Sequence, residues 1–205
     1  MTLIRPFAGL RPVAGRAADV VAPPYDVLNS AEARQRAEGR PWSFLHISRA
    51  EIDLPEGTEP YDAAVYSKAA ENLQHILDEG VLQRDSQPCY YVYRLVMGDH
   101  SQTGLVAVAS VADYDSNRIR RHEFTRPDKQ DDRVRHIEAL NAQTGPVLLA
   151  YKSREEVDAL LEAVTRGEPE VEVVADDGIG HSFWVVSDSD RIDGITRAFD
   201  AMDAL

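Results

Sequence analysis

The stretch Cys89-Tyr-Tyr-Val-Tyr-Arg-Leu-Val-Met97 is rich in aromatic and β-branched residues, a composition typical of a β-strand. Gly98-Asp99 offers a turn, and Thr103–Val111 then predicts the returning strand of a long hairpin. A second hairpin is expected from Val171–Val174 and Phe183–Val186, which flank a polar turn. Because hairpins join antiparallel neighbours, these segments predict a mainly antiparallel or mixed sheet.

Helical patterns surround the two hairpins. Apolar residues recur at helical spacing between Pro60 and Gly80, and a further helix is predicted from Pro127 to Asn141. Ser30–Gly39 and Ile192–Leu205 predict two more helices, and Ser153-Arg-Glu-Glu156 has the pattern of a capping box at the start of another. Strands interrupted by helices in this order indicate an α+β fold with helices flanking the sheet.

Shorter segments complete the predicted organisation. The apolar runs Trp42–Ser48 and Pro146–Tyr151 predict two additional strands, and the acidic stretch Glu51–Pro60 predicts an exposed connection. No repeat and no Gly/Ser-rich linker divides the sequence. We therefore expect residues 1–205 to form a single α+β domain.

Charge and composition narrow the class of protein. The chain has 22 Lys and Arg residues against 35 Asp and Glu residues, a formal net charge of −13 that disfavours nucleic-acid binding. No apolar run approaches the roughly 20 residues of a bilayer span, and no secretory leader is present, so we expect a cytoplasmic protein without a membrane partner. The single cysteine, Cys89, excludes an internal disulfide and a cysteine-only metal site.

Positive charge gathers in one part of this acidic chain. Between positions 118 and 136 the strong bases are Arg118, Arg120, Arg121, Arg126, Lys129, Arg133 and Arg135. The same window contains four acidic residues, so its local charge is +3, by 7 minus 4. Such an island is typical either of a pocket for a small anion or of a solvated helix laced with ion pairs, and both interpretations stay open.

Helix geometry supports the anion pocket, and the solvated helix stays open as the alternative. Lys129, Arg133 and His136 lie at i, i+4 and i+7 and form one stripe on the predicted helix. This stripe borders a face that Val134 and Ile137 are expected to bury. Bases at the border of a buried face can converge on a cleft, so we interpret Lys129, Arg133 and His136 as phosphate-binding candidates.

Further candidates precede this helix or lie near the N-terminus of the chain. Thr125 is at the start of the helix, where free backbone N–H groups add anion affinity. His122 and Glu123 are candidate catalytic residues, although a strand-end polar pair is the structural alternative. Asp26 is a third candidate because the prolines of Val21-Ala-Pro-Pro-Tyr-Asp-Val27 stiffen the approach to its carboxylate, although the same stiffness suits a turn. The histidine spacing indicates no zinc site.

Several strings of the sequence together resemble a known family. They are Ile4-Arg-Pro-Phe-Ala-Gly-Leu-Arg-Pro12, Val21–Val27, Ser43-Phe-Leu-His46, His122-Glu-Phe-Thr125, Lys129, Asp132-Arg133 and Pro146–Tyr151. In this order, from about residue 4 to residue 151, the chain resembles the domain-of-unknown-function family 1015. Members of that family are usually much longer and carry an Asp-Gly-His-His-Arg string. That string is similar to one in free serine kinases of the ParB/sulfiredoxin-like fold, and the present chain lacks it.

The resemblance implies the N-terminal portion of a longer protein, a small-molecule phosphotransferase similar to free amino-acid kinases. In such an enzyme Lys129, Arg133 and His136 would hold phosphate oxygens of ATP or ADP. Asp26 or Glu123 would orient a hydroxyl nucleophile or bind Mg²⁺. Because the Asp-Gly-His-His-Arg string is missing, we expect the chain alone to be inactive.

Two other functions remain as alternatives. The first is a non-catalytic module that senses a nucleotide or another small anion. The second is a DNA-associated function by analogy with ParB, which the net charge of −13 and the lack of a helix-turn-helix signature make the weakest.

Overall fold

The computed structural model describes residues 2–122 and 124–205, and its antiparallel strands and flanking helices confirm the predicted α+β class. The chain divides into two compact units, each of which is described by itself. Unit 1 comprises Met1–Ala14, Arg84–Glu123 and Leu148–Leu205, and unit 2 comprises Gly15–Gln83 and Phe124–Val147. The single domain expected over residues 1–205 stays a prediction.

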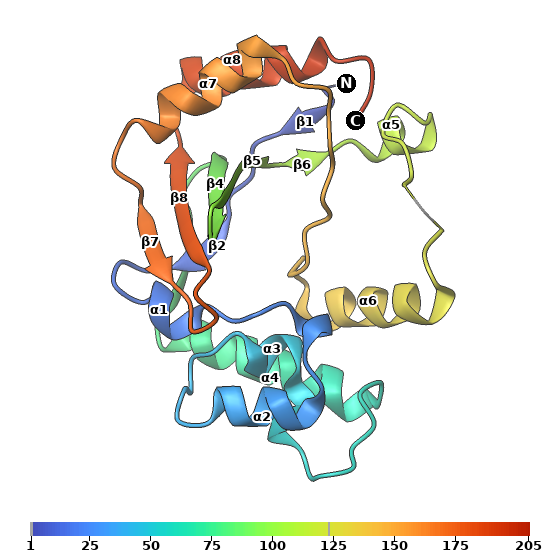
Figure 1. Ribbon diagram of the computed structural model, residues 1–205. Helices are drawn as coiled ribbons and strands as arrows, with labels where there is room; N and C mark the ends of the chain where they lie inside the picture. The colour runs from blue at the N-terminus through green and yellow to red at the C-terminus, as the bar shows by residue number, and fades with distance from the viewer. Residues whose placement is uncertain (1, 123) are drawn as a thin grey trace. The chain divides into compact units, whose positions relative to one another are not determined.

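Unit 1 is built on a four-stranded antiparallel sheet with the order β5-β4-β8-β7 (Figure 1). Its strands are β4 (Tyr90–Met97), β5 (His100–Val106), β7 (Val171–Val174) and β8 (Gly180–Val186). The shorter strands are β1 (Ile4–Arg5), β2 (Leu10–Pro12) and β6 (Val108–Ala109), of which β1 and β6 pair with each other. The helices are α5 (Val111–Asp115), α7 (Glu155–Thr165) and α8 (Ser189–Asp200). Both predicted hairpins are confirmed.

One face of this sheet is buried against α7 and α8. Tyr90 lies opposite Val186, and Val92 lies opposite Trp184, and all four side chains are buried. The inner residues of α7 and α8, among them Phe199, belong to the same hydrophobic cluster. Burial alternates along β8, whereas Tyr90, Tyr91 and Val92 of β4 are all buried, so the start of β4 is covered on both faces.

Tyr91, on the other face of β4, holds the N-terminal segment. Its hydroxyl accepts a hydrogen bond from the Gly9 backbone N–H at 2.7 Å and donates one to the Asp85 carboxylate at 2.7 Å. Arg11 binds the same carboxylate, with its Nε 2.9 Å from Asp85 Oδ1. Burial, together with the bond to Asp85, raises the pKa of Tyr91, so the hydroxyl remains a donor. The N-terminal Gly and Arg thus have structural roles.

Unit 2 is mainly helical (Figure 1). Its elements are α1 (Ala17–Val20), the 3₁₀ helix η1 (Tyr25–Val27), α2 (Ser30–Ala37), α3 (Leu45–Ser48), the 3₁₀ helix η2 (Ala50–Asp53), α4 (Ala63–Asp78) and α6 (Pro127–Leu140). Strand β3 (Leu82–Arg84) lies where unit 2 ends. Helix α4 packs against α3, η2 and α6, and a small apolar cluster joins α2, α3 and η2.

The strongest helix predictions for unit 2 are confirmed. Helix α6 begins with Pro127 in its first turn and is ended by Asn141, whose φ of 47° is left-handed. Helix α4 lies within the predicted stretch. Helix α2 starts with a capping box between Asn29 and Glu32, so local hydrogen bonds define its N-terminus.

The strand predicted over Trp42–Ser48 is wrong, because its C-terminal half forms α3. Leu45 and Ile47 are both buried, a pattern that a strand or a short helical turn can produce in so short a run. Contacts with the neighbouring helix α4 favour the helical turn. The carbonyl of His46 accepts a hydrogen bond from Asn72 Nδ2 of α4 at 2.6 Å, rather than from a neighbouring strand.

The strand predicted over Pro146–Tyr151 is also wrong. Among the described residues this segment belongs to no strand, and Val147 and Leu148 are 76% and 84% exposed. An apolar run becomes a strand only where a sheet is available to pair with it. The division between the two units falls between these two residues.

Several boundaries differ from the predicted ones, and the last helix, expected over Ile192–Leu205, is α8 at Ser189–Asp200. The returning strand expected over Thr103–Val111 is divided into β5 and β6, and β6 pairs with β1 rather than with β4. The capping box predicted at Ser153 is wrong, since its hydroxyl donates to Asp158 and the N-cap residue of α7, Arg154, makes no capping bond.

None of the helices in the described part of the chain has the length and apolar character that a bilayer span requires.

We predict that Gly9→Ala destabilises unit 1 by about 1 to 3 kcal/mol, because an added Cβ would lie 2.6 Å from the anchored Tyr91 hydroxyl. Urea unfolding followed by Trp184 fluorescence in a Trp42→Phe background measures the change. Gly104→Ala is the matched control, since its Cβ would meet open space, and stability should stay equal or rise slightly. Equal stability of the Gly9→Ala variant and its parent would contradict the packing argument.

Candidate functional site

Helix α6 places Lys129 and Arg133 one turn apart, and each lies against a tyrosine ring. Lys129 Nζ donates to the Tyr61 hydroxyl at 2.7 Å and lies 5.4 Å from the centroid of that ring. The guanidinium carbon of Arg133 lies 4.2 Å from the centroid of the Tyr25 ring. We call these four residues, Tyr25, Tyr61, Lys129 and Arg133, the tyrosine–cation cluster. The bond to Tyr61 raises the pKa of Lys129, so its ammonium group remains charged.

A buried carboxylate orients Arg133. Asp132, only 6% exposed, accepts hydrogen bonds on Oδ2 from Arg133 Nε at 3.0 Å and Nη2 at 2.6 Å. Its Oδ1 accepts from the Tyr66 hydroxyl of α4 at 2.9 Å. Burial and the bond to Asp132 raise the pKa of Tyr66 to about 12, so this hydroxyl is always a donor. Among the described residues Arg133 Nη1 has no bonded partner, which leaves that edge for an external acceptor.

The other side of the cluster is held by Arg49. Its Nη1 donates to the Tyr25 carbonyl at 3.1 Å, and its Nη2 donates to Ser30 Oγ at 3.1 Å. Arg49 also pairs with Glu51 at 2.8 Å, and Glu51 is only 3% exposed. The exposed connection predicted for Glu51–Pro60 is therefore wrong at its first residues. A buried ion pair, added to two prolines, fixes the backbone at Tyr25.

Asp26 follows Tyr25 in η1 and is exposed to solvent. No described residue forms a hydrogen bond or an ion pair with its carboxylate, which is free to meet a ligand. Thr125 is also exposed, and its hydroxyl donates to the Gln130 side chain at 3.1 Å. Asp26 is therefore next to Tyr25 of the cluster along the chain, whereas Thr125 is engaged locally at the start of α6.

His136 faces the interior of unit 2. It is 3% exposed, its Nε2–H donates to the Ile47 carbonyl at 3.0 Å, and Thr144 Oγ1 lies 3.5 Å from its Nδ1. Burial lowers the pKa of His136, so the ring is neutral near pH 7. Val134, in contrast, is 45% exposed, so its predicted burial is wrong, whereas Leu140, which extends the same predicted face, is buried. Asp132 and His136 are buried as well, because hydrogen-bond partners inside unit 2 satisfy both.

Two further catalytic candidates, His122 and Glu123, directly precede the segment that leads into α6. His122 belongs to unit 1 and is exposed. Glu123 lies outside the residues that the structure describes. Their predicted catalytic roles stay predictions.

Two other bases of the positive window serve as structural donors. Arg118 Nη2 donates to the carbonyls of Asp200 and Met202, at 2.8 Å each. Arg135 pairs with Asp131 at 2.8 Å across one exposed turn of α6. These two arginines therefore bind other parts of the protein, as the ion-pair alternative predicts. Lys129 and Arg133, in contrast, retain free donors.

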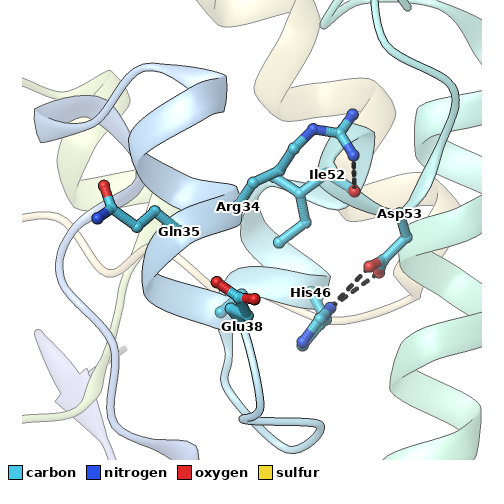
Figure 2. Close-up of a pocket in the computed structure, with 7 residues that line it drawn as sticks. Arg34, Gln35, Glu38, His46, Ile52 and Asp53 are labelled. Atoms are coloured by element: carbon cyan, nitrogen blue, oxygen red, sulfur yellow. Dashed lines mark hydrogen bonds and ion pairs between the residues drawn. The ribbon is translucent and has the colours of Figure 1, made fainter.

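His46 is a charged structural residue. Its Nε2 lies 3.1 Å from the Arg40 carbonyl, and its Nδ1 lies 2.9 Å from Asp53 Oδ1 (Figure 2). A carbonyl and a carboxylate both accept, so both ring nitrogens carry protons. The bond to Asp53 raises the pKa of His46, and Asn72 Nδ2 holds the same carboxylate at 2.7 Å. With both nitrogens occupied, His46 has no free site for general-base chemistry.

Tyr25, Tyr61, Tyr66 and Asp132 were not among the predicted site residues. Asp132 is next to Arg133 in the sequence, and adjacent residues of a helix do not normally face each other. Tyr66 and Tyr61 come from a distant part of the chain, so no local spacing indicated their contact with α6. Among the described residues no three His, Cys, Asp or Glu side chains lie together as a metal site would require.

Comparison with known proteins identifies the family of this chain. Residues 4–205 match the family model described as a protein of unknown function, DUF1015. The chain belongs to this family, and the match extends the resemblance beyond residue 151 to the last residue. The comparisons with curated proteins and with solved structures gave no match. The relationship to kinases of the ParB/sulfiredoxin-like fold stays a prediction.

We predict that Tyr66→Phe lowers the free energy of unfolding by about 1 to 3 kcal/mol, because buried Asp132 then loses one of its donors. Urea unfolding followed by far-ultraviolet circular dichroism measures the difference. Tyr61→Phe removes a matched hydroxyl that donates no such bond and only meets exposed Lys129. It should leave stability within about 0.5 kcal/mol of the parent. Equal effects of the two substitutions would argue against the Asp132 network.

The His46–Asp53 pair predicts a pH dependence of stability. Because the folded-state pKa of His46 is raised, its contribution is complete below the unfolded-state pKa of about 6.5. That contribution is lost as the pH rises through the folded-state value. NMR titration of the imidazole protons should give a pKa above 6.5 in the parent and a lower one in Asp53→Asn. An unchanged His46 pKa in Asp53→Asn would refute the pairing.

Proposed function

We propose that the protein is part of a small-molecule phosphotransferase and that the tyrosine–cation cluster binds the phosphate groups of ATP or ADP. The observation that supports this proposal is the arrangement of Lys129 and Arg133. They lie one turn apart on α6, and each is held against a tyrosine ring while keeping donors free for a ligand. Two cations with free donors on neighbouring turns of one helix suit a ligand that carries several phosphate oxygens.

Phosphoryl transfer depends mainly on positioning and on neutralisation of charge. A long cationic side chain is a poor positioning group when it is free to rotate, because ordering it upon binding costs entropy. In this structure Asp132 and the Tyr25 ring already order Arg133, and Tyr61 orders Lys129. The ordering cost is therefore met by the fold, and less of the binding energy is lost when phosphate arrives.

Asp26 is the carboxylate that fits a supporting role. Mg²⁺ in nucleotide complexes is commonly held by one or two carboxylates together with phosphate oxygens. Asp26 is exposed, has no bonded partner among the described residues and directly follows Tyr25. When bound, Mg²⁺ would neutralise charge on the phosphates, and Asp26 would be its ligand from this chain.

A module that binds a nucleotide without turning it over is the second candidate. The observation that favours it is the position of His136, which is buried and neutral instead of lying at the surface beside Lys129. The cluster thus presents cations and aromatic rings, while the histidine of the predicted stripe is unavailable as a surface acid or base. Binding and turnover must therefore be measured separately.

Binding is tested with Lys129→Gln. We predict that it weakens ATP, ADP and pyrophosphate by about tenfold in isothermal titration calorimetry, the loss of one charge-assisted hydrogen bond. Arg135→Gln is the matched control, since it removes the same charge from the same helix at an exposed ion pair outside the cluster. Arg133→Lys keeps the positive charge but loses the planar guanidinium with its paired N–H donors, so it should also weaken binding. Equal losses in Lys129→Gln and Arg135→Gln would overturn the proposed site.

Turnover is tested by nucleotide consumption with serine and a panel of other amino acids. The assay uses this chain and a form that also carries the Asp-Gly-His-His-Arg string. Consumption that depends on an amino acid and on Lys129 supports the phosphotransferase. Binding without consumption in either form favours the sensing module, and absence of both binding and consumption removes the proposal.

A further inference from the structure

A hollow of about 330 Å³ opens in unit 2 between α2, α3 and η2 (Figure 2). The residues that line it are Arg34, Gln35, Ala37, Glu38, His46, Ile52 and Asp53. Ala37 and Ile52 are buried and supply an apolar wall, while the remaining lining side chains are polar. The hollow is shallow and open to solvent.

The cationic groups of the lining are already engaged. Arg34 Nη2 donates to the carbonyls of Glu51 at 3.0 Å and Leu54 at 2.8 Å, and its Nη1 donates to the carbonyl of Ile52. The imidazolium of His46 uses both of its N–H groups, on Asp53 and on a backbone carbonyl. Because these donors close hydrogen bonds within the fold, they offer little to an anionic ligand.

The acceptor groups that line the hollow are less engaged than the donors. Glu38 is exposed, and no hydrogen bond or ion pair joins its carboxylate to any described residue. Gln35 likewise makes no such bond within the described part of the chain. Asp53 accepts from His46 and Asn72, and a carboxylate has room for about four donors. The hollow therefore presents one unengaged carboxylate, that of Glu38, beside an apolar wall.

The charge of Glu38 has no evident structural purpose. Glu38 directly follows the last residue of α2, at the helix end where the backbone dipole disfavours a carboxylate. Unlike Glu32, which closes the capping box at the other end of α2, Glu38 satisfies no backbone group. A negative charge that the fold does not use is available for a ligand.

We propose that this hollow is a binding site for a small organic cation, an alkylammonium compound whose charged nitrogen is bound by Glu38. The ammonium N–H groups would donate to Glu38 and to the remaining acceptor sites of Asp53, and the aliphatic part would pack on Ile52 and Ala37. An ammonium suits these acceptors better than a metal ion, since no three ligating side chains lie together among the described residues. This site is independent of the tyrosine–cation cluster.

The test uses n-butylammonium chloride as the probe, with 1-butanol and sodium butyrate as its neutral and anionic counterparts. NMR titration of the full chain follows the backbone amides of residues 34–38 and the methyl groups of Ile52. Saturable shift changes with n-butylammonium, together with much weaker ones for the other two compounds, are the expected result. Equal responses to n-butylammonium and 1-butanol would overturn the proposal, because the carboxylate would then contribute nothing.

Glu38→Gln keeps the shape of the side chain and should weaken n-butylammonium binding by about tenfold or more, the loss of a charge-assisted hydrogen bond. Glu56→Gln is the matched control, an exposed residue of the same unit outside the lining, and should bind as the parent does. Since the fold does not use the charge of Glu38, both variants should retain the parent melting temperature. Parent-like affinity in a folded Glu38→Gln variant would also overturn the proposal.

Discussion

The arrangement of unit 2 around its candidate site depends on one buried carboxylate. Asp132 faces inward from α6, where it binds Tyr66 of α4 with one oxygen and Arg133 with the other. A buried carboxylate without partners would be strongly destabilising, so α4 and α6 must dock in the register that supplies them. The same contact fixes a guanidinium that lies against Tyr25. The contact that packs α4 against α6 therefore also orients the Arg133 guanidinium.

The strings that resemble the family do not all serve one purpose. In the N-terminal string, Gly9 and Arg11 are held by Tyr91 and by Asp85, and their role is to fasten a segment to the sheet of unit 1. The string that contains Tyr25 is held by its backbone, which leaves the ring and the following carboxylate available. Family-specific residues can therefore be separated into anchors and presented groups by asking whether their polar atoms are already satisfied.

Prediction from the sequence succeeded where local physics is sufficient. Pro127, with its fixed φ, marks the start of α6, and Asn141, with its left-handed φ, marks its end. The aromatic and β-branched residues of Cys89–Met97 correctly predicted the strand β4. It failed over Trp42–Ser48 and Pro146–Tyr151, because short apolar runs take the structure that their neighbours provide. For the site, the spacing of Lys129 and Arg133 was predicted, but the inward turn of His136 was not.

By itself, the sequence determined the α+β class, the main helices and hairpins, the acidic surface and the position of the cationic stripe, since each follows from periodicity, capping or composition. Only the tertiary structure decided which basic side chains have free donors and which form hydrogen bonds or ion pairs within the protein. That distinction depends on partners such as Tyr61 and Tyr66, which are far from α6 along the chain. A hydrogen bond between distant residues has no local signature, because it forms only once packing has brought donor and acceptor together.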